Sequence, residues 1–80
     1  MTISYSIRIV DEDGNGVEGA NVYIEYGGLL GSWDEGYTDE NGWVEFDTSQ
    51  DIISKVYVND EIVGEDYRVE EGDTFSFTES

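Results

Sequence analysis

The sequence predicts an all-β fold, a single small antiparallel seven-stranded β-sandwich. Short runs of alternating apolar and polar residues recur along the chain, separated by acidic, glycine-containing turns at intervals of roughly ten residues. No window shows the periodicity of a helix, and the chain contains no proline. Because 80 residues suffice for only one compact core, residues 1–80 are expected to form one domain.

The alternation predicts each strand in turn. Strands are expected at residues 3–9, 20–25, 33–38, 43–47, 53–59, 62–69 and 75–77. In most of these strands, apolar residues recur at every second position and are expected to face the other sheet. This inward set comprises Ile3, Tyr5, Ile7, Ile9, Ala20, Val22, Ile24, Val44, Phe46, Val56, Val58, Phe75 and Phe77.

Two acidic turns ending in glycine echo each other, at residues 13–16 and 39–42. Each leads into a strand with alternating apolar residues, which is typical of a β-hairpin. In the second turn, Gly42 is predicted to take the positive φ that closes a type I turn into a bulge, while the side chain of Asp39 caps the turn. The residues expected to shape the turns are Gly14, Gly16, Asp39, Asn41, Gly42 and Gly72.

The segments 10–22 (VDEDGNGVEGANV) and 38–46 (TDENGWVEF) carry a resemblance to a known family. The chain resembles the carboxypeptidase regulatory-domain-like family, whose fold is a prealbumin-like (transthyretin-like) sandwich with Ig-like Greek-key connections. The resemblance covers residues 3–47 in motif and the remainder only in strand rhythm. It implies a scaffold that recurs in surface proteins, adhesins, secreted enzymes and phage structural proteins, and it implies no particular activity.

The net charge of −17 limits the classes of molecule that the chain can bind. Three basic residues face twenty acidic ones, so no basic patch exists to displace counterions from nucleic acid or to bind an acidic membrane. A single lysine, Lys55, among so many acids resembles the composition of proteins from halophilic organisms. Ordinary acidity for solubility is the alternative interpretation.

The first acidic turn also matches the opening of a calcium loop. Asp11, Asp13 and Asn15 follow the pattern D-x-[DN]-x-[DN]-G, in which alternate side-chain oxygens surround a hard cation. The closing glutamate of such a loop would fall at Val22, so the pattern is incomplete. The other interpretation is a turn that uses Asp and Asn for local backbone hydrogen bonds, with no cofactor bound.

Large apolar residues near the third and fourth strands form the candidate protein-interaction surface, which comprises Leu29, Leu30, Trp33 and Trp43. The alternative is that they close one end of the sandwich as part of the core. The tyrosines are a second candidate, an outward aromatic face for sugars or a neighbouring subunit. They are Tyr5, Tyr23, Tyr26, Tyr37, Tyr57 and Tyr67, and each is also an ordinary strand residue.

The sequence predicts no enzyme, because it has no histidine, no cysteine and no recognisable catalytic motif. The expected function is that of a non-catalytic structural or interaction module. It would build or decorate a larger extracellular assembly, such as a virion capsid or tail or a cell-surface layer, through protein subunits or self-association. A carbohydrate- or calcium-binding adhesion module is the alternative.

The opening residues 1–8 lack a basic segment followed by an apolar block, and no apolar run is long enough to cross a membrane. Neither a secretory signal nor a transmembrane segment is therefore expected. A place outside the cell would be reached within a virus particle or by cleavage from a longer precursor.

The net charge predicts that the stability of the fold depends on salt concentration. On a surface of roughly 4,900 Å², net charges lie about 17 Å apart, and their repulsion totals on the order of 10 kcal/mol without screening. Physiological salt, with a Debye length of about 8 Å, reduces this to one or two kcal/mol. We expect the melting temperature to rise between about 0.05 and 2 M NaCl, measured by circular dichroism. A melting temperature that stays constant over this range contradicts the halophilic interpretation.

Overall fold

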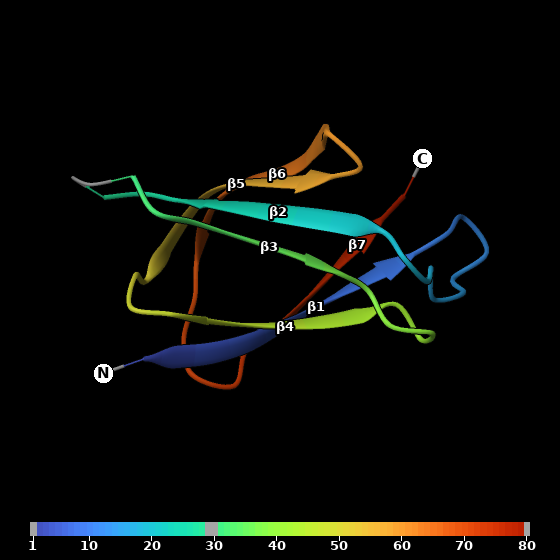
Figure 1. Cartoon of the computed structure of the whole chain (residues 1–80), viewed down its shortest axis with the longest axis horizontal. Helices are drawn as coiled ribbons and strands as arrows, with labels where there is room; N and C mark the ends of the chain where they lie inside the picture. Colours follow the sequence, from blue (N-terminus) through green and yellow to red (C-terminus); the bar gives the residue numbers. More distant parts are fainter. Residues whose placement is uncertain (1, 29–30, 80) are drawn as a thin grey trace.

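A computed structural model describes residues 2–28 and 31–79, and this part of the chain is all β (Figure 1). Two sheets face each other across the core. The strands are β1 (Ile3–Val10), β2 (Asn21–Tyr26), β3 (Trp33–Tyr37), β4 (Trp43–Thr48), β5 (Ile52–Val58), β6 (Glu61–Arg68) and β7 (Thr74–Thr78). These confirm the predicted β-sandwich and its strand positions to within a few residues.

One sheet has the order β4-β1-β7 and the other has the order β3-β2-β5-β6. The connections β1–β2, β3–β4, β4–β5 and β6–β7 each pass from one sheet to the other. All neighbouring strands run antiparallel except β1 and β7, which are parallel with Ser6 opposite Thr74. β7 runs in the same direction as β1 and lies beside its second half, Ser6 to Val10.

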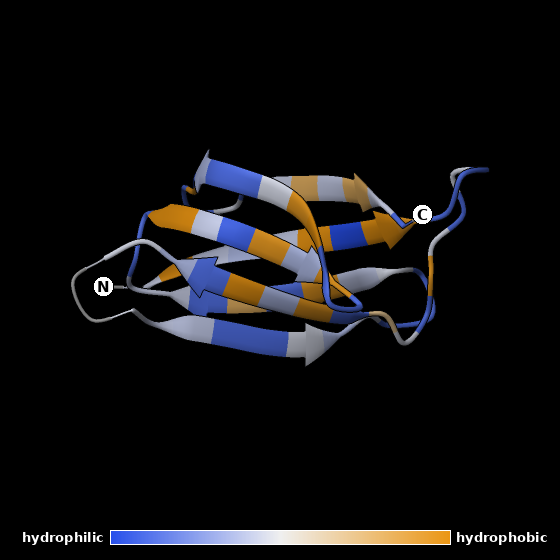
Figure 2. Ribbon diagram, turned by 90° about the horizontal axis from the view of Figure 1, so that it is seen from above, coloured by the Kyte–Doolittle hydropathy of each residue, from blue (hydrophilic) through white to orange (hydrophobic). Residues whose placement is uncertain are grey.

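Alternation of side chains between core and solvent builds the interior, and Figure 2 shows the matching bands of hydropathy along the strands. Five core residues are completely buried: Ile7, Ile9, Val22, Ile24 and Val56. Among residues 2–28 and 31–79, the buried apolar set is Tyr5, Ile7, Ile9, Ala20, Val22, Ile24, Tyr26, Phe46, Ile53, Val56, Val58, Val69 and Phe77. Ile3, Val44 and Phe75 pack against this set, so the predicted inward residues are all found on the core side.

A buried chain of polar groups links the two sheets. The hydroxyl groups of Tyr5 on β1 and Tyr26 on β2 are hydrogen-bonded, and Tyr26 Oη donates to Asp34 Oδ2 on β3 at 2.8 Å. Since Tyr26 has one hydroxyl proton, Tyr5 donates to Tyr26. Desolvation raises the pKa of both tyrosines, and for Tyr26 the bonds to Tyr5 and Asp34 raise it further. The neutral phenols are therefore the form that the fold requires.

The two acidic turns have the same hydrogen-bond pattern. In each, the first aspartate accepts two backbone amides on one carboxylate oxygen: Asp11 Oδ1 from residues 13 and 15, and Asp39 Oδ1 from residues 41 and 43. Gly14 and Gly42 close the turns with φ of 87° and 86°. The amides of Trp43 and Asn41 lower the pKa of Asp39. The predicted capped turn with a glycine bulge is thus confirmed, and residues 11–15 repeat it.

These two turns also pack against each other at one end of the sandwich. The amide of Ile9 donates to Gly42 O at 2.8 Å, and the amide of Val17 donates to Ile9 O at 2.9 Å. A Cβ added to Gly16 would overlap the Asn41 carbonyl group, and one added to Gly42 would lie 2.9 Å from the Gly16 Cα. Gly16 is therefore required for close backbone approach, whereas Gly14 is required for its φ.

The accessible surface is 5017 Å², close to the value expected from the chain's size. An ion pair joins Arg68 to Asp51 at 3.7 Å, but both side chains are mostly exposed, so it contributes little stability. The acidic surface therefore retains its self-repulsion.

The glycine contacts predict different costs for two similar substitutions. We expect Gly16→Ala to lower the free energy of unfolding by about 3 kcal/mol or more, because its methyl group meets fixed backbone. Gly14→Ala has open space around the methyl group, so it should cost only the left-handed strain of about 1 kcal/mol. Urea unfolding in 2 M NaCl measures both, and equal losses would contradict the docking of the two turns.

The buried tyrosines predict a loss of stability at alkaline pH. Their pKa values are raised on folding, so their contribution is complete below the unfolded pKa of about 10 and declines as the pH rises above it. We expect the unfolding free energy to fall between pH 9 and 11 by more in the native chain than in Tyr5→Phe/Tyr26→Phe. All other residues are the same in both proteins, so the difference between the two pH profiles isolates the buried pair. If both proteins lost the same unfolding free energy over this pH range, ionisation of Tyr5 and Tyr26 would not be coupled to folding.

Candidate functional site

The calcium candidates lie in the first acidic turn. Asp11 Oδ1 is occupied by the amides of Asp13 and Asn15, each at 2.9 Å, while the side chains of Asp13 and Asn15 lie at the surface. Within residues 2–28 and 31–79, no group of three acidic side chains is arranged to hold a metal ion. The turn interpretation accounts for these residues by their backbone bonds.

The candidate interaction surface is divided by the fold. Trp33 begins β3 in the four-stranded sheet, whereas Trp43 begins β4 in the three-stranded sheet at the other end of the molecule (Figure 1). Leu29 and Leu30 lie outside the described residues. The two tryptophans therefore do not share one surface. Trp33 is 57% exposed on the outer side of its sheet, so it is not a plug of the core.

Trp43 already has a partner within the chain. The Arg8 guanidinium carbon lies 5.8 Å from the centre of the Trp43 ring, a cation–π distance. Arg8 Nε also donates to Asn41 O at 3.2 Å, which ties the arginine to the second acidic turn. Arg8, one of the three basic residues in the chain, thus packs against the outward-facing ring of Trp43.

The six tyrosines separate into inner and outer groups. Tyr5 and Tyr26 are buried, and Tyr67 packs edge-to-face on Phe75 and Phe77. Tyr23, Tyr37 and Tyr57 lie on the outer face of the four-stranded sheet, because they alternate with inward residues on β2, β3 and β5.

Tyr23, Trp33 and Tyr57 form an ordered aromatic cluster on this outer face. The rings of Tyr23 and Trp33 are stacked, with centroids 5.4 Å apart and an interplanar angle of 14°. Tyr57 lies directly opposite Tyr23 across β2 and β5, and the two rings meet at 75° with centroids 5.6 Å apart. Such pairs contribute about 0.5–1.5 kcal/mol beyond burial, so the rings are held in place before any partner arrives.

A groove of about 330 Å³ lies beside these rings, lined by Asn21, Tyr23, Glu25, Glu35, Tyr57 and Asp60. Asn21 Nδ2 donates to Glu35 Oε2 at 2.9 Å, which fixes one carboxylate at the rim. We name this set, together with Trp33, the aromatic groove.

The β5–β6 turn positions the third carboxylate of the aromatic groove. Asn59 and Asp60 have φ of 49° and 71°, the positive values of a two-residue type I′ hairpin turn. Asn59 Oδ1 accepts the Asn21 amide at 3.0 Å, which pins the turn to β2. Asp60 is thereby placed over the same face as Tyr23 and Tyr57.

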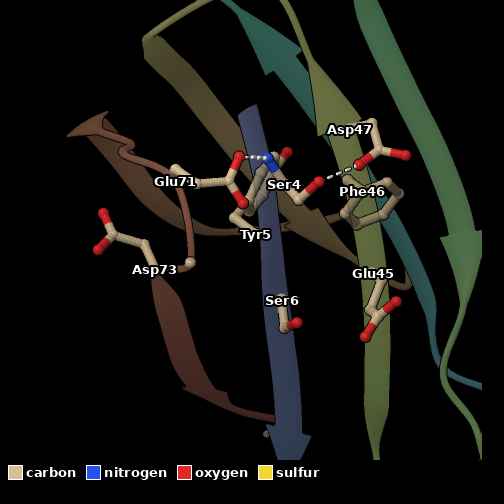
Figure 3. A pocket seen from close by; sticks show the side chains of 9 residues that line it. Ser4, Tyr5, Ser6, Glu45, Phe46, Asp47, Glu71 and Asp73 are labelled. Carbon is tan, nitrogen blue, oxygen red and sulfur yellow. Dashed lines mark hydrogen bonds between the residues drawn. The ribbon is translucent and has the colours of Figure 1, made fainter. Parts of the chain in front are cut away.

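A second hollow, of about 260 Å³, lies on the three-stranded sheet (Figure 3). Four carboxylates surround Ser4 and Ser6 there: those of Glu45, Asp47, Glu71 and Asp73. Ser4 Oγ donates to Asp47 Oδ1, and the Ser4 amide donates to Glu71 Oε1 at 3.1 Å. The bond to Glu71 fastens the turn at residues 70–73 to β1, and the bond to Asp47 joins β1 to β4, so both have a structural role.

The aromatic groove combines π faces from its rings with hydrogen-bond acceptors from its carboxylates and amide. Sequence reasoning singled out Trp33, Tyr23 and Tyr57 separately but missed Glu25, Glu35 and Asp60. The period-two pattern placed the tyrosines outward, but only the pairing of β2 with β3 and β5 brings the carboxylates to them.

No protein-family model and no curated protein matches this chain. In the part of the chain that the structure describes, no helix has the length and apolar character to cross a membrane.

Proposed function

We propose that this chain is a non-catalytic structural or interaction module of the carboxypeptidase regulatory-domain-like type. It builds or decorates a larger extracellular assembly, such as a virion capsid or tail or the surface layer of a halophile, and contacts a protein neighbour through the aromatic groove. The observation that carries this proposal is the stacked Tyr23–Trp33 pair, which leaves an indole 57% exposed on a rigid sheet. Exposed, preordered aromatics are typical anchors of protein interfaces.

The surroundings of the groove favour a protein over a carbohydrate neighbour. Tyr37 on β3 and Ile62 on β6, 68% and 50% exposed, extend the apolar surface across the sheet, with Ile62 directly opposite Tyr57. A surface that spans four strands is broader than a single sugar ring needs. Carbohydrate binding remains the second candidate, because the Tyr23–Trp33 rings also form a flat platform beside hydrogen-bonding groups.

Site-specific photo-crosslinking in the organism that encodes the chain tests the proposal. Trp33→p-benzoyl-phenylalanine places the reactive group at the aromatic groove, and Glu45→p-benzoyl-phenylalanine places it on the exposed outer side of the other sheet. We expect one dominant protein adduct from position 33 and none from position 45, identified by mass spectrometry. Unchanged melting temperatures verify that both variants fold.

Two results contradict the proposal. One is the absence of a protein adduct at position 33 together with glycan-array binding that depends on Trp33, which supports the carbohydrate function. The other is equal crosslinking at positions 33 and 45, which shows that the aromatic groove is not the contact.

A further inference from the structure

We propose that the aromatic groove receives an arginine side chain of the neighbouring protein, with the guanidinium group against the tyrosine rings and its N–H groups on the rim carboxylates. This inference rests on the proposed function and names the chemistry of its partner. It follows from three features of the groove: its rings, its charges and its size.

The rings and carboxylates meet within one small space. Tyr23 and Tyr57 stand at 75° to each other, and Glu25, Glu35 and Asp60 line the same groove. An aromatic face attracts a cation through its quadrupole, and carboxylates accept the hydrogen bonds of that cation. A volume of about 330 Å³ is near the lower end for ligand sites, so it suits one side chain better than a larger ligand.

The charges of the groove are not neutralised from within the chain. Among residues 2–28 and 31–79, no ion pair within 4 Å reaches Glu25, Glu35 or Asp60, and no cation lies over Tyr23, Trp33 or Tyr57. Lys55 faces the same side, opposite Glu25 on β2 and Glu65 on β6, without closing an ion pair to either. Lys55 supplies one positive charge beside the three carboxylates of the groove, so the groove keeps a net negative charge that a cationic side chain of a partner would complement.

The other sheet shows how this chain accommodates a guanidinium. Arg8 lies over Trp43 at 5.8 Å and donates from Nε to a carbonyl at 3.2 Å, so ring contact and hydrogen bonding occur together. The aromatic groove offers the same two elements, a ring and an oxygen acceptor, without the cation. Arginine is favoured over lysine because its guanidinium is planar, stacks on rings and is less strongly hydrated.

High salt favours interactions that act at contact distance over long-range charge attraction. In 1 M salt the Debye length is about 3 Å, so long-range attraction between an acidic module and a basic partner is lost. Stacking and hydrogen bonding act at contact distance and persist. An arginine seated in the groove would therefore remain bound where diffuse charge attraction fails.

The test is an NMR titration of the whole chain in 1 M NaCl with acetyl-Gly-Arg-Gly-amide. The control peptides carry lysine or citrulline in place of arginine, since citrulline keeps the shape and loses the charge. We expect shifts confined to the aromatic groove and the Trp33 indole N–H, with affinity at least about tenfold weaker for citrulline. Lysine should bind more weakly than arginine by about two- to fivefold.

Matched variants locate the binding. Tyr57→Leu should weaken the arginine peptide by about two- to fivefold, and Glu35→Gln by a similar factor. Glu45→Gln, which removes the same charge from the other sheet, should leave it unchanged. Chemical shifts at the core residues verify that each variant keeps its fold.

Three outcomes overturn the inference: shifts spread over all the acidic turns, equal binding of the arginine and citrulline peptides, or equal effects of Glu35→Gln and Glu45→Gln. None of them removes a protein adduct at position 33, so the proposed function can stand when the arginine inference fails. Failure of the crosslink, in contrast, removes the function itself.

Discussion

The contact between the inner faces of the two sheets is the interaction on which the rest of this molecule depends. An 80-residue chain with a net charge of −17 has no disulfide, and the ion pair between Arg68 and Asp51 is exposed. Burial of the apolar side chains between β1, β2, β5 and their neighbours, thirteen among the described residues, must therefore outweigh both chain entropy and charge repulsion. The Tyr5–Tyr26–Asp34 chain adds a polar link inside this core, satisfied at every member and so compatible with burial.

The acidic turns show how the chain uses carboxylates to organise its backbone. Asp11 and Asp39 each satisfy two amides, and the contact between Gly16 and Gly42 joins the two turns where the sheets meet. The type I′ turn at Asn59 and Asp60 also organises the backbone, because its bonds to Asn21 hold β5 against β2. Rigid turns of this kind fix the outer face of the four-stranded sheet, and with it the aromatic groove.

The outer surface has two contrasting parts. Most of it is acidic and hydrated, which suits an exterior exposed to concentrated salt and discourages contact with other acidic proteins. The aromatic groove interrupts this surface with stacked rings, and its own carboxylates favour a cationic neighbour. Specificity for one partner would then come from a single contact of matched shape and charge, while the remaining acidic surface repels other acidic proteins.

The sequence alone determined the β-sandwich, the strand positions and the capped turns, because each depends on local periodicity or on turn chemistry within a few residues. The period of two indicated that Tyr23 and Tyr57 face outward, whereas the expectation that Tyr26 belongs to an outward aromatic face is wrong, because Tyr26 is buried. Only the tertiary structure decided that Trp33 and Trp43 lie on separate sheets and that Glu25, Glu35 and Asp60 gather around Tyr23 and Tyr57. Those placements depend on which strands pair and in what register, and pairing between residues far apart in the chain leaves no signal in any local stretch.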